Sequence, residues 1–521
     1  MEKEIKKTEF SVHNKLLLFL SFLEGGSLMA TELLSARMLA PYFGSSLFVW
    51  ATVLAVTLGG LTIGYFLGGV ISTNVKKDKF LLITLLYCGI LIMMMPFTAQ
   101  WILNFAHLFS FNESVIQSGM LIILPPVIGM GMVSPLTIAN LDATAENSGK
   151  KAGLVYAIST TGGILYTFLF GFYVIPRFGL IIPSIAAGFV LGIIPAFLLF
   201  KNGWKKSGVF FIIFIACIGY RSWQRKLTNK KIDIVYQKEG ILGQVLVADI
   251  PIFKNGKTEV ERSLFVNRII QTTYNKDNKK FNDHAYFNVT EDILSRFPEK
   301  SRMLLLGLGG GVLAEFGIDR KFEVHAVELD QRIIEVSQKY FNLSKDVKII
   351  QEDARRFINN DTCKYDIIIF DLFRGEETPA HVFTAESITA SKKLLTENGL
   401  MLINANGYFR HDIGKGTRSL FKTIRGLGLY VELYPTGKTE STSNMIYLVS
   451  KNRDVFDDYL PDYVKDNFIA SDEINIEDAL ILTDRRPILD HLNKDATKAW
   501  RLGYMQYMNN FYKDYNIPLF N

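Results

Sequence analysis

The first 200 residues contain six apolar runs long enough to cross a lipid bilayer. A transmembrane helix needs about 20 mostly apolar residues, because its backbone polar groups have to be satisfied within the segment itself. A seventh run, residues 209–220, is shorter. The expected spans are residues 16–39, 47–71, 80–105, 115–140, 152–175 and 180–200. The sequence therefore predicts an α-helical transmembrane bundle of six or seven spans over residues 1–222 of a multi-pass protein of the cell membrane.

Basic residues between the expected spans indicate which ends face the cytoplasm, where Lys and Arg concentrate. Lys77, Lys151 and Lys205 mark three loops that lie on one side if the N-terminus is inside. Six spans then return the chain to the cytoplasm, whereas a seventh would export the rest of it. We expect a shallow or interfacial seventh run and a cytoplasmic soluble domain, with six and seven spans both left open. No cleavage site follows the charged N-terminus, so we expect a retained first span.

Three charged residues, Glu24, Glu32 and Arg37, lie within the first expected span. A carboxylate at mid-membrane costs at least ~2.5 kcal/mol on insertion scales and is normally paired or functional. In one interpretation Glu32 and Arg37 lie near the far interface. In the other, Glu24 or Glu32 lines a site for a cationic ligand, and the chain is a polyamine transporter or sensor with a non-catalytic soluble domain.

The second and fourth expected spans carry residues that govern helix packing. Gly60, Gly64 and Gly68 recur every four residues, the spacing that lets two helix backbones approach closely in lipid. Pro125 and Pro126 would bend or break the fourth helix unless neighbours satisfy the freed backbone groups. We expect the glycines of the second span to pack closely against another helix, and the prolines of the fourth span either to bend or to break its helix.

Charge divides between the two halves of the chain. Residues 1–231 hold 19 Lys and Arg against 9 Asp and Glu, whereas residues 232–521 hold 38 against 42. The hydrophobic half therefore has a net charge of +10 and the other half one of −4, so no broad basic face remains for a nucleic acid. The three cysteines give neither a disulfide framework nor a zinc-type spacing. We expect no nucleic-acid partner.

Beyond Lys231 the pattern changes to short apolar runs separated by turn residues. Runs such as MLLLGLGGG and YDIIIFDLF are continuously apolar, which is typical of strands buried in a parallel sheet. Helical stretches at residues 331–341 and 385–395 intervene. The alternation predicts a doubly wound, Rossmann-like α/β domain over residues 281–521, preceded by a small β-hairpin subdomain at residues 232–280.

Four successive strand ends of this predicted sheet carry glycines or acids. The glycines would let the backbone turn tightly and approach a ligand. The first acid follows them by about 20 residues, the offset at which a carboxylate hydrogen-bonds ribose hydroxyls. Because ligands of open α/β sheets bind outside the carboxyl ends of the strands, these positions describe one nucleotide-binding crevice. They are Gly307, Gly309, Gly310, Gly311, Glu328, Asp353 and Asp371.

The order of these segments resembles the polyamine aminopropyltransferases, the spermidine synthase family, over about residues 235–495. The motifs are the glycine loop, VELD, EDAR, an Asp-led loop closing with HVFT, and the late segment LTDRRPILDHL. The segments LMATELLSARMLAPYFGSS and AGLVYAISTTGGIL are similar to the membrane part of the multi-pass members. The resemblance implies a membrane-bound enzyme with a methyltransferase-type sheet.

In that family a primary amine attacks the methylene beside the sulfonium of decarboxylated S-adenosylmethionine, and methylthioadenosine leaves. The resemblance therefore implies a polyamine aminopropyltransferase with that co-substrate, a diamine such as putrescine as acceptor, no metal, and a homodimer. An alkylamine, with a pKa of about 10.4, is mostly protonated at neutral pH. A carboxylate then has to orient the amine and accept its proton.

The family's functional residues carry over to this sequence position by position. Asp371 matches the catalytic aspartate, and Tyr286 the tyrosine of the gate over the substrate groove. Glu328 would hold the cofactor ribose, and Asp353 with Ala354 the adenine. The other implied contacts are Gly307, Gly309, Gly310, Gly311 and Gln271 at the cofactor, with Gln244 and Glu376 at the substrate.

The sequence departs from the family pattern at three places. Gly310 stands where an aspartate usually binds the amine of the transferred group, and Arg374 replaces a second aspartate. Phe287 and Asn288 stand where the soluble enzymes carry a His-Glu pair. The family's cofactor-binding residues are therefore better matched in this sequence than the residues that select its substrate. Without the loop carboxylate the site suits intact S-adenosylmethionine as well, so the alternative is a methyltransferase acting on a membrane-associated substrate.

Overall fold

The structure, a computed structural model, describes residues 2–44, 46–73, 77–106, 109–141, 147–240, 242–254, 256–278, 280–281, 284–373, 379–440, 443–470 and 473–520. The chain forms two compact units. We call the first, made of Met1–Ile232, Gln237–Gln244 and Asn510–Asn521, the helical unit. The second, made of Asp233–Tyr236 and Val245–Asn509, is the sheet unit.

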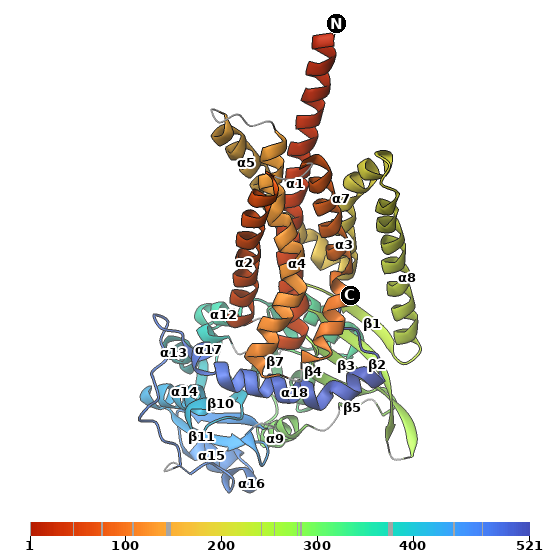
Figure 1. The fold of residues 1–521 in the computed structure, drawn as a ribbon. Coiled ribbons are helices and arrows are strands. Elements are labelled where there is room, and N and C mark those ends of the chain that lie inside the picture. The colour runs from red at the N-terminus through yellow and green to blue at the C-terminus, as the bar shows by residue number, and fades with distance from the viewer. Residues whose placement is uncertain are drawn as a thin grey trace. The chain divides into compact units, whose positions relative to one another are not determined.

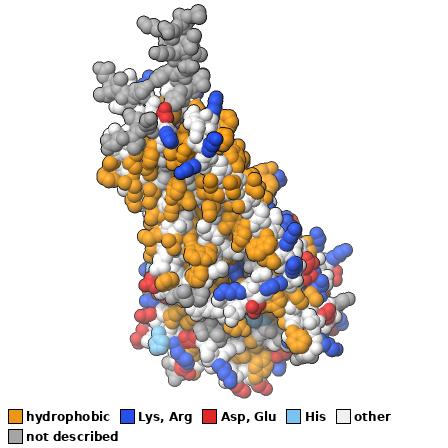
Figure 2. Space-filling model, turned by 45° about the vertical axis from the view of Figure 1, so that its right-hand side comes forward, with side chains coloured by type: hydrophobic (Ala, Val, Ile, Leu, Met, Phe, Trp, Pro, Cys, Tyr) orange, Lys and Arg blue, Asp and Glu red, His pale blue; other side chains and the backbone are white. Residues whose placement is uncertain are grey.

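Long helices make up most of the helical unit and run side by side in Figure 1. A π-helical turn at Leu169–Val174 joins α5 to a short α6 (Ile175–Phe178). The long helices are α1 (Glu2–Phe43), α2 (Leu47–Ile71), α3 (Lys77–Leu103), α4 (Phe111–Asn140), α5 (Ser148–Phe168), α7 (Ile181–Lys201) and α8 (Val209–Asn229). Hydrophobic side chains cover the visible face of this unit almost continuously (Figure 2).

Seven helical segments among the described residues are long and apolar enough to cross a membrane, by length and composition. The seventh, Lys205–Asn229, includes the run whose apolar part seemed short in the sequence. It belongs to the bundle because α8 lies along α3: Gln224 donates to Gln100 at 3.0 Å, and the Tyr220 and Phe97 ring centroids are 5.3 Å apart. Its length in the structure favours the seven-helix alternative.

The glycine row of α2 packs against α4, as the four-residue spacing predicted. A Cβ added at Gly64 would lie 2.3 Å from the carbonyl oxygen of Ile128, and one at Gly68 would lie 2.8 Å from Cα of Met132. Larger side chains would force the two backbones apart. Helix α4 continues through its prolines instead of breaking, and the Cys88 thiol lies 3.6 Å from the carbonyl oxygen of Pro126, within hydrogen-bond reach.

The sheet unit contains two sheets, whose strands appear as arrows in Figure 1. The five-stranded sheet has the order β1-β2-β3-β4-β5, and the seven-stranded sheet the order β11-β12-β10-β9-β6-β7-β8. The strands of the first are β1 (Asp233–Lys238), β2 (Val245–Lys254), β3 (Lys257–Val266), β4 (Ile269–Asn275) and β5 (Lys280–Phe281). Those of the second are β6 (Arg302–Leu306), β7 (Glu323–Glu328), β8 (Lys348–Gln351), β9 (Tyr365–Phe370), β10 (Leu395–Asn406), β11 (Tyr430–Pro435) and β12 (Asn444–Ser450).

Strand direction in the seven-stranded sheet confirms the predicted doubly wound, Rossmann-like fold. Strands β10, β9, β6, β7 and β8 pair in parallel, and β12 joins β10 and β11 antiparallel. The connecting helices are α9 (Ala285–Leu294), α10 (Val312–Asp319), α11 (Gln331–Tyr340), α12 (Ala354–Asn360), α13 (Ala385–Leu394), α14 (Lys415–Gly426), α15 (Asp454–Tyr459), α16 (Asp462–Lys465), α17 (Leu489–Leu492) and α18 (Lys494–Asp514).

The central strands are buried on both faces, which explains their continuously apolar sequences. In β6, Met303 and Leu305 belong to one hydrophobic cluster, whereas Leu304 and Leu306 belong to the other. Because side chains alternate across a strand, every position meets a core. Each fully buried Leu contributes about 1.5–3 kcal/mol of transfer free energy. The sheet is therefore a firm support for the residues at its carboxyl edge.

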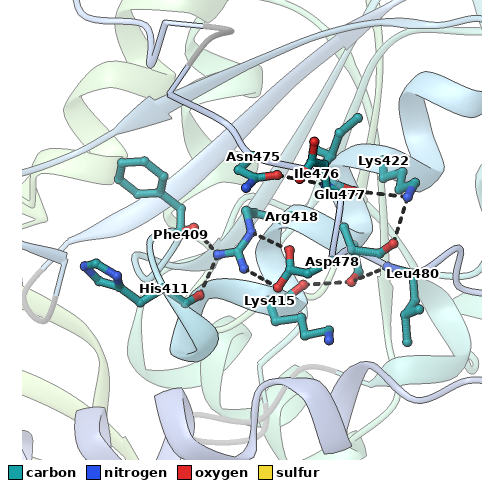
Figure 3. Close-up of polar contacts among 12 residues, drawn as sticks. Phe409, His411, Lys415, Arg418, Lys422, Asn475, Ile476, Glu477, Asp478 and Leu480 are labelled. Carbon is teal, nitrogen blue, oxygen red and sulfur yellow. Dashed lines mark hydrogen bonds and ion pairs between the residues drawn. The ribbon is translucent and has the colours of Figure 1, made fainter.

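A buried guanidinium on α14 anchors the chain that follows β10 (Figure 3). Arg418 is 5% exposed and donates 2.6 Å hydrogen bonds to the carbonyl oxygens of Phe409 and His411. It also pairs with Asp478 through two hydrogen bonds of 3.3 and 2.7 Å. Lys422, one turn further along α14, donates to two more carbonyl groups of the 475–480 segment. These charge-assisted bonds fix two irregular segments that the strands alone leave without partners.

Candidate active site

The glycine loop joins β6 to α10 through left-handed backbone. Gly307, Gly309 and Gly311 have φ angles of +93°, +52° and +91°, which side chains other than glycine rarely adopt. The N–H of Gly307 donates to the carbonyl oxygen of Val327 on β7 at 2.8 Å, which sets the loop against the neighbouring strand. The sequence prediction of a tight turn between a strand and a helix is confirmed.

Glu328, the last residue of β7, is hydrogen-bonded to this loop. Its Oε2 accepts from the N–H of Leu308 at 3.1 Å, and its Oε1 from the N–H of Asp330 at 2.8 Å. Burial raises the pKa of the Glu328 carboxyl, and these backbone bonds counter part of that rise. Each carboxylate oxygen can accept a further hydrogen bond. The structure thus brings together the glycine loop and Glu328, which the sequence predicted at one edge of the sheet.

Asp371 follows β9 and lies against the first glycine of the loop. Its N–H donates to the carbonyl oxygen of Leu306 at 2.8 Å. A Cβ added at Gly307 would lie 2.1 Å from the carbonyl oxygen of Asp371. The backbone of the predicted catalytic residue is therefore in direct contact with the loop, as the convergence of adjacent parallel strand ends requires.

Two asparagines that the sequence analysis did not single out hold the Asp371 carboxylate. Asn404 of β10 donates to its Oδ1 at 2.9 Å, and Asn444 of β12 donates to Oδ1 of Asn404 at 2.8 Å. Burial raises the pKa of Asp371 from 3.8 to about 6, although the Asn404 bond opposes the rise. A carboxylate with this pKa can take up a proton near neutral pH.

Tyr286 of α9 presents a buried phenol beside this carboxylate. The side chain is 2% exposed, and its hydroxyl has no hydrogen-bond partner among the described residues. Burial raises the pKa of the phenol well above its ordinary value, and the charge of Asp371 raises it further. Since buried polar groups are rarely left unpaired, an open hydroxyl next to Asp371 is suited to contact a ligand.

Thr272 of β4 fills the space beside Gly310. Its Oγ1 accepts a 3.0 Å hydrogen bond from the N–H of Gly310, and a Cβ at Gly310 would lie 2.5 Å from Cγ2 of Thr272. No larger side chain fits at position 310 while Thr272 keeps this position. The space beside Gly310 is therefore filled by a side chain from another strand.

The EDAR segment caps α12. Asp353 accepts from the N–H of Arg356 at 3.1 Å, and its Oδ2 lies 3.2 Å from Nε2 of His381. Ala354 is buried as the first residue of α12. Asp353 thus has a capping role of its own, and its predicted contact with adenine stays a prediction.

One ion-pair network joins three of the motifs that carried the resemblance. Arg355 of EDAR donates to Oγ1 of Thr384 in HVFT at 3.1 Å and to Asp484 in LTDRRP at 2.7 Å. Thr384 in turn donates to Asp484 at 2.6 Å. These distant segments are therefore parts of one arrangement at the carboxyl edge of the sheet.

The structure does not test the roles predicted for the remaining residues, Gln271, Gln244 and Glu376. Gln271 is half-buried on β4, next to Thr272. Gln244 belongs to the helical unit, where its amide donates to Glu239 at 2.8 Å. Glu376 lies outside the described residues, as does Arg374. The substrate contacts expected of Gln244 and Glu376, and the cofactor contact expected of Gln271, stay predictions.

The arrangement offers hydrogen-bonding groups and carboxylates at one edge of a sheet. Glu328 can accept further hydrogen bonds, such as those of a ribose diol, and Asp371 can accept a proton. In the part of the chain that the structure describes, no three His, Cys, Asp or Glu residues are grouped to hold a metal ion. These residues are suited to binding hydroxyl groups and to accepting a proton.

Comparison with known proteins finds a matching domain and several similar proteins. Residues 298–453 match the family described as spermine/spermidine synthase domain. The chain is 28% identical over 423 residues to polyamine aminopropyltransferase 2 of Aquifex aeolicus, covering 77% of this chain and 80% of that protein. It is 33% identical over 116 residues to the polyamine aminopropyltransferase of Vibrio vulnificus, covering 20% of this chain and 38% of the relative. The spermidine synthase of Thermotoga maritima aligns with a TM-score of 0.35 at 18% identity, covering 52% of this chain and 88% of that one.

The Aquifex alignment extends far beyond the matched domain, so it includes part of the helical unit as well as the sheet unit. The domain match itself runs from the end of α9 through β12 and contains the glycine loop, Glu328, Asp353 and Asp371. The chain therefore contains a spermine/spermidine synthase domain over residues 298–453, and it resembles the polyamine aminopropyltransferases over a longer stretch that includes part of a helical unit with seven apolar segments.

Proposed function

We propose that the protein is a membrane-bound polyamine aminopropyltransferase that transfers an aminopropyl group from decarboxylated S-adenosylmethionine to a diamine such as putrescine. The observation that carries the proposal is the buried Asp371 carboxylate, held by Asn404 and in backbone contact with the glycine loop. Its raised pKa of about 6 suits a group that takes a proton from an amine near neutral pH.

The proposed reaction accounts for each bond formed or broken and for the proton released. The amine nitrogen attacks the methylene beside the sulfonium, the new C–N bond forms as the C–S bond breaks, and methylthioadenosine leaves as a neutral thioether. Asp371 orients the amine and accepts the proton that the nitrogen loses. Glu328 holds the ribose hydroxyls, and the hydroxyl of Tyr286 contacts the amine chain beside Asp371.

One observation favours the second candidate, a methyltransferase that uses intact S-adenosylmethionine. Thr272 fills the space beside Gly310, the residue that stands where the resemblance implies an aspartate, and it brings no charge. The carboxylate of S-adenosylmethionine would meet no like charge there. Asp371 and the aminopropyltransferase relatives favour the first candidate.

Product analysis separates the two candidates. We expect purified full-length protein to release methylthioadenosine from decarboxylated S-adenosylmethionine only when a diamine is present, and to form the aminopropylated amine in equal amount. Liquid chromatography with mass detection measures both products. Release of S-adenosylhomocysteine from S-adenosylmethionine, with no methylthioadenosine from the other donor, would establish the methyltransferase instead.

We also propose that the helical unit lies in the cell membrane and that the sheet unit faces the cytoplasm, where nucleoside sulfonium donors are made. If all seven apolar segments cross, the N-terminus and the basic loops at Lys77, Lys151 and Lys205 then lie on the opposite side, whereas six crossings would keep them in the cytoplasm. A basic cluster at the end of α8 supports a cytoplasmic sheet unit, because basic residues beside a span favour the cytoplasm. Its residues are Arg221, Arg225, Lys226, Lys230 and Lys231. We expect a reporter fused at the C-terminus to be active in the cytoplasm and one fused at the N-terminus to be active outside. Activity of both in the cytoplasm would mean six spans.

A further inference from the structure

A carboxylate is buried inside the helical unit, far from any role in the proposed transfer reaction. Glu24 lies on α1 within the candidate span Asn14–Phe43 and is 3% exposed. Its Oε2 accepts a 3.1 Å hydrogen bond from the hydroxyl of Ser159 on α5. Among the described residues, no Lys, Arg or His pairs with it at salt-bridge distance.

Four glycines bring this carboxylate against α5. A Cβ added at Gly25 would lie 2.0 Å from the carbonyl oxygen of Ser159, and one at Gly162 would lie 2.1 Å from the carbonyl oxygen of Phe22. Gly26 and Gly163 meet side chains of the facing helix in the same way. The two helices therefore cross where EGG of one segment meets STTGG of the other. STTGG lies within the membrane segment AGLVYAISTTGGIL singled out in the sequence, EGG lies just before the other one, and their contact fixes the position of Glu24.

Further polar groups without partners lie beside Glu24. The hydroxyls of Ser21 and Ser27, both 0% exposed, have no hydrogen-bond partner in the described part of the chain. They stand three residues before and three residues after Glu24 on α1, so their Cβ atoms are about 5–6 Å from that of Glu24. Buried hydroxyls are normally satisfied by protein, water or a ligand. Three groups at one place thus have unused hydrogen-bonding capacity.

Other helices also reach the neighbourhood of Glu24. Tyr65 of α2 and Cys88 of α3 lie close enough for an electrostatic interaction with it. Glu24 therefore faces the inside of the bundle, where α1, α2, α3 and α5 approach one another, and not the lipid. A charged group in such a place is normally paired with an opposite charge or has a functional role.

We propose that Glu24, with Ser21, Ser27 and Ser159, forms a binding site for one primary ammonium group inside the helical unit. An ammonium has three N–H donors and no acceptor. The site offers a carboxylate and several hydroxyl oxygens, which can accept all three donors while the charges neutralise each other. The choice of an alkylammonium over a metal cation rests on the proposed function, because amines are then the acceptor and the product of the sheet unit. The helical unit would accordingly bind or conduct the amines that the sheet unit converts.

Carbodiimide labelling of the full-length protein in lipid vesicles tests this site. Carbodiimides react with protonated carboxyls in apolar surroundings, and peptide mass spectrometry finds the labelled residue. We expect labelling at Glu24 and at least a fivefold decrease when putrescine is added, but no decrease with sodium chloride of equal ionic strength. Glu32, on the same helix and half-buried, serves as the internal reference and should keep its labelling. Glu24→Gln should remove the putrescine-sensitive signal.

Two matched serine variants sharpen the test. Ser21→Ala with Ser27→Ala should raise the putrescine concentration for half-protection about tenfold, whereas Ser222→Ala, at an exposed serine of α8, should not change it. Protection by sodium alone, or labelling of Glu24 that no amine affects, would overturn the proposal. Methylthioadenosine release is measured on the same vesicles. Release without protection refutes only this inference, and protection without release refutes only the proposed function.

Discussion

Replacing Asp371 by asparagine should lower methylthioadenosine release about 10²- to 10⁴-fold and at the same time make the protein more stable at neutral pH. The activity is lost because an amide cannot accept the proton of the attacking amine. The stability is gained because burial disfavours the charged carboxylate, whose pKa is raised from 3.8 to about 6. Asn404 can still donate to the new amide oxygen, so the hydrogen bond at 2.9 Å is kept.

The sign of the stability change follows from proton binding. Between pH 3.8 and about 6 the folded chain holds more protons at Asp371 than the unfolded chain does. Stability therefore falls as the pH rises through this window, and the penalty is fully present above it. A shift of about two pKa units corresponds to at most about 3 kcal/mol. The activity of the parent enzyme should instead decrease as the pH drops below about 6, because Asp371 then becomes protonated.

Thermal unfolding at pH 7.5 and pH 5, together with product release over the same range, measures both effects. Asp319→Asn is the control, because Asp319 is exposed at the end of α10 and should change neither quantity. If the Asp371 variant keeps more than a tenth of the parent activity, another group takes the proton and the catalytic assignment is wrong.

The sheet and its nucleotide edge could be predicted because both depend on local patterns. Strands buried on two faces have to be apolar throughout, so the sequence shows β6 and β9 as continuous apolar stretches. Parallel strand ends meet at one edge, so the contact of Gly307 with Asp371 followed from their order. The resemblance to the aminopropyltransferases was confirmed by the domain match.

The supporting residues could not be predicted in the same way. Asn404 ends an apolar run just as Asp371 does, but an uncharged amide at a strand end does not by itself indicate a binding site. Thr272 reaches the glycine loop only through the pairing of a separate sheet. Arg418 lies on an amphipathic helix, where a charged residue is expected to face water, and its burial depends on carbonyl groups from distant segments.

The length of α8 was misjudged for a physical reason. Its uninterrupted apolar run ends at Tyr220, and Arg221 suggested the end of the span. The helix continues to Asn229 because Trp223 and the aliphatic parts of basic side chains can extend an apolar surface toward the interface. Contacts with α3, which the sequence does not reveal, hold this second half in the bundle.

Replacing Gly307 by alanine should cost at least about 4 kcal/mol of unfolding free energy, an exceptionally large loss for a single substitution, because the new side chain is sterically incompatible with the fold. The φ angle of +93° alone strains any side chain by about 1–2 kcal/mol. The added Cβ would also lie 2.1 Å from the carbonyl oxygen of Asp371. That carbonyl cannot move away easily, because the N–H of the same residue is bonded to Leu306 on β6. Thermal unfolding of the full-length protein in detergent measures the loss.

Gly428→Ala separates the backbone strain from the contact with Asp371. Gly428 has a similar left-handed φ of +68°, but nothing lies within 4 Å of a Cβ added there. This variant should lose only the strain, about 1–2 kcal/mol, and keep its activity. Equal losses for the two variants would mean that the loop can shift away from Asp371. In that case the glycine loop and the carboxylate would not be rigidly coupled, and Gly307→Ala should still release methylthioadenosine at a rate close to that of the parent.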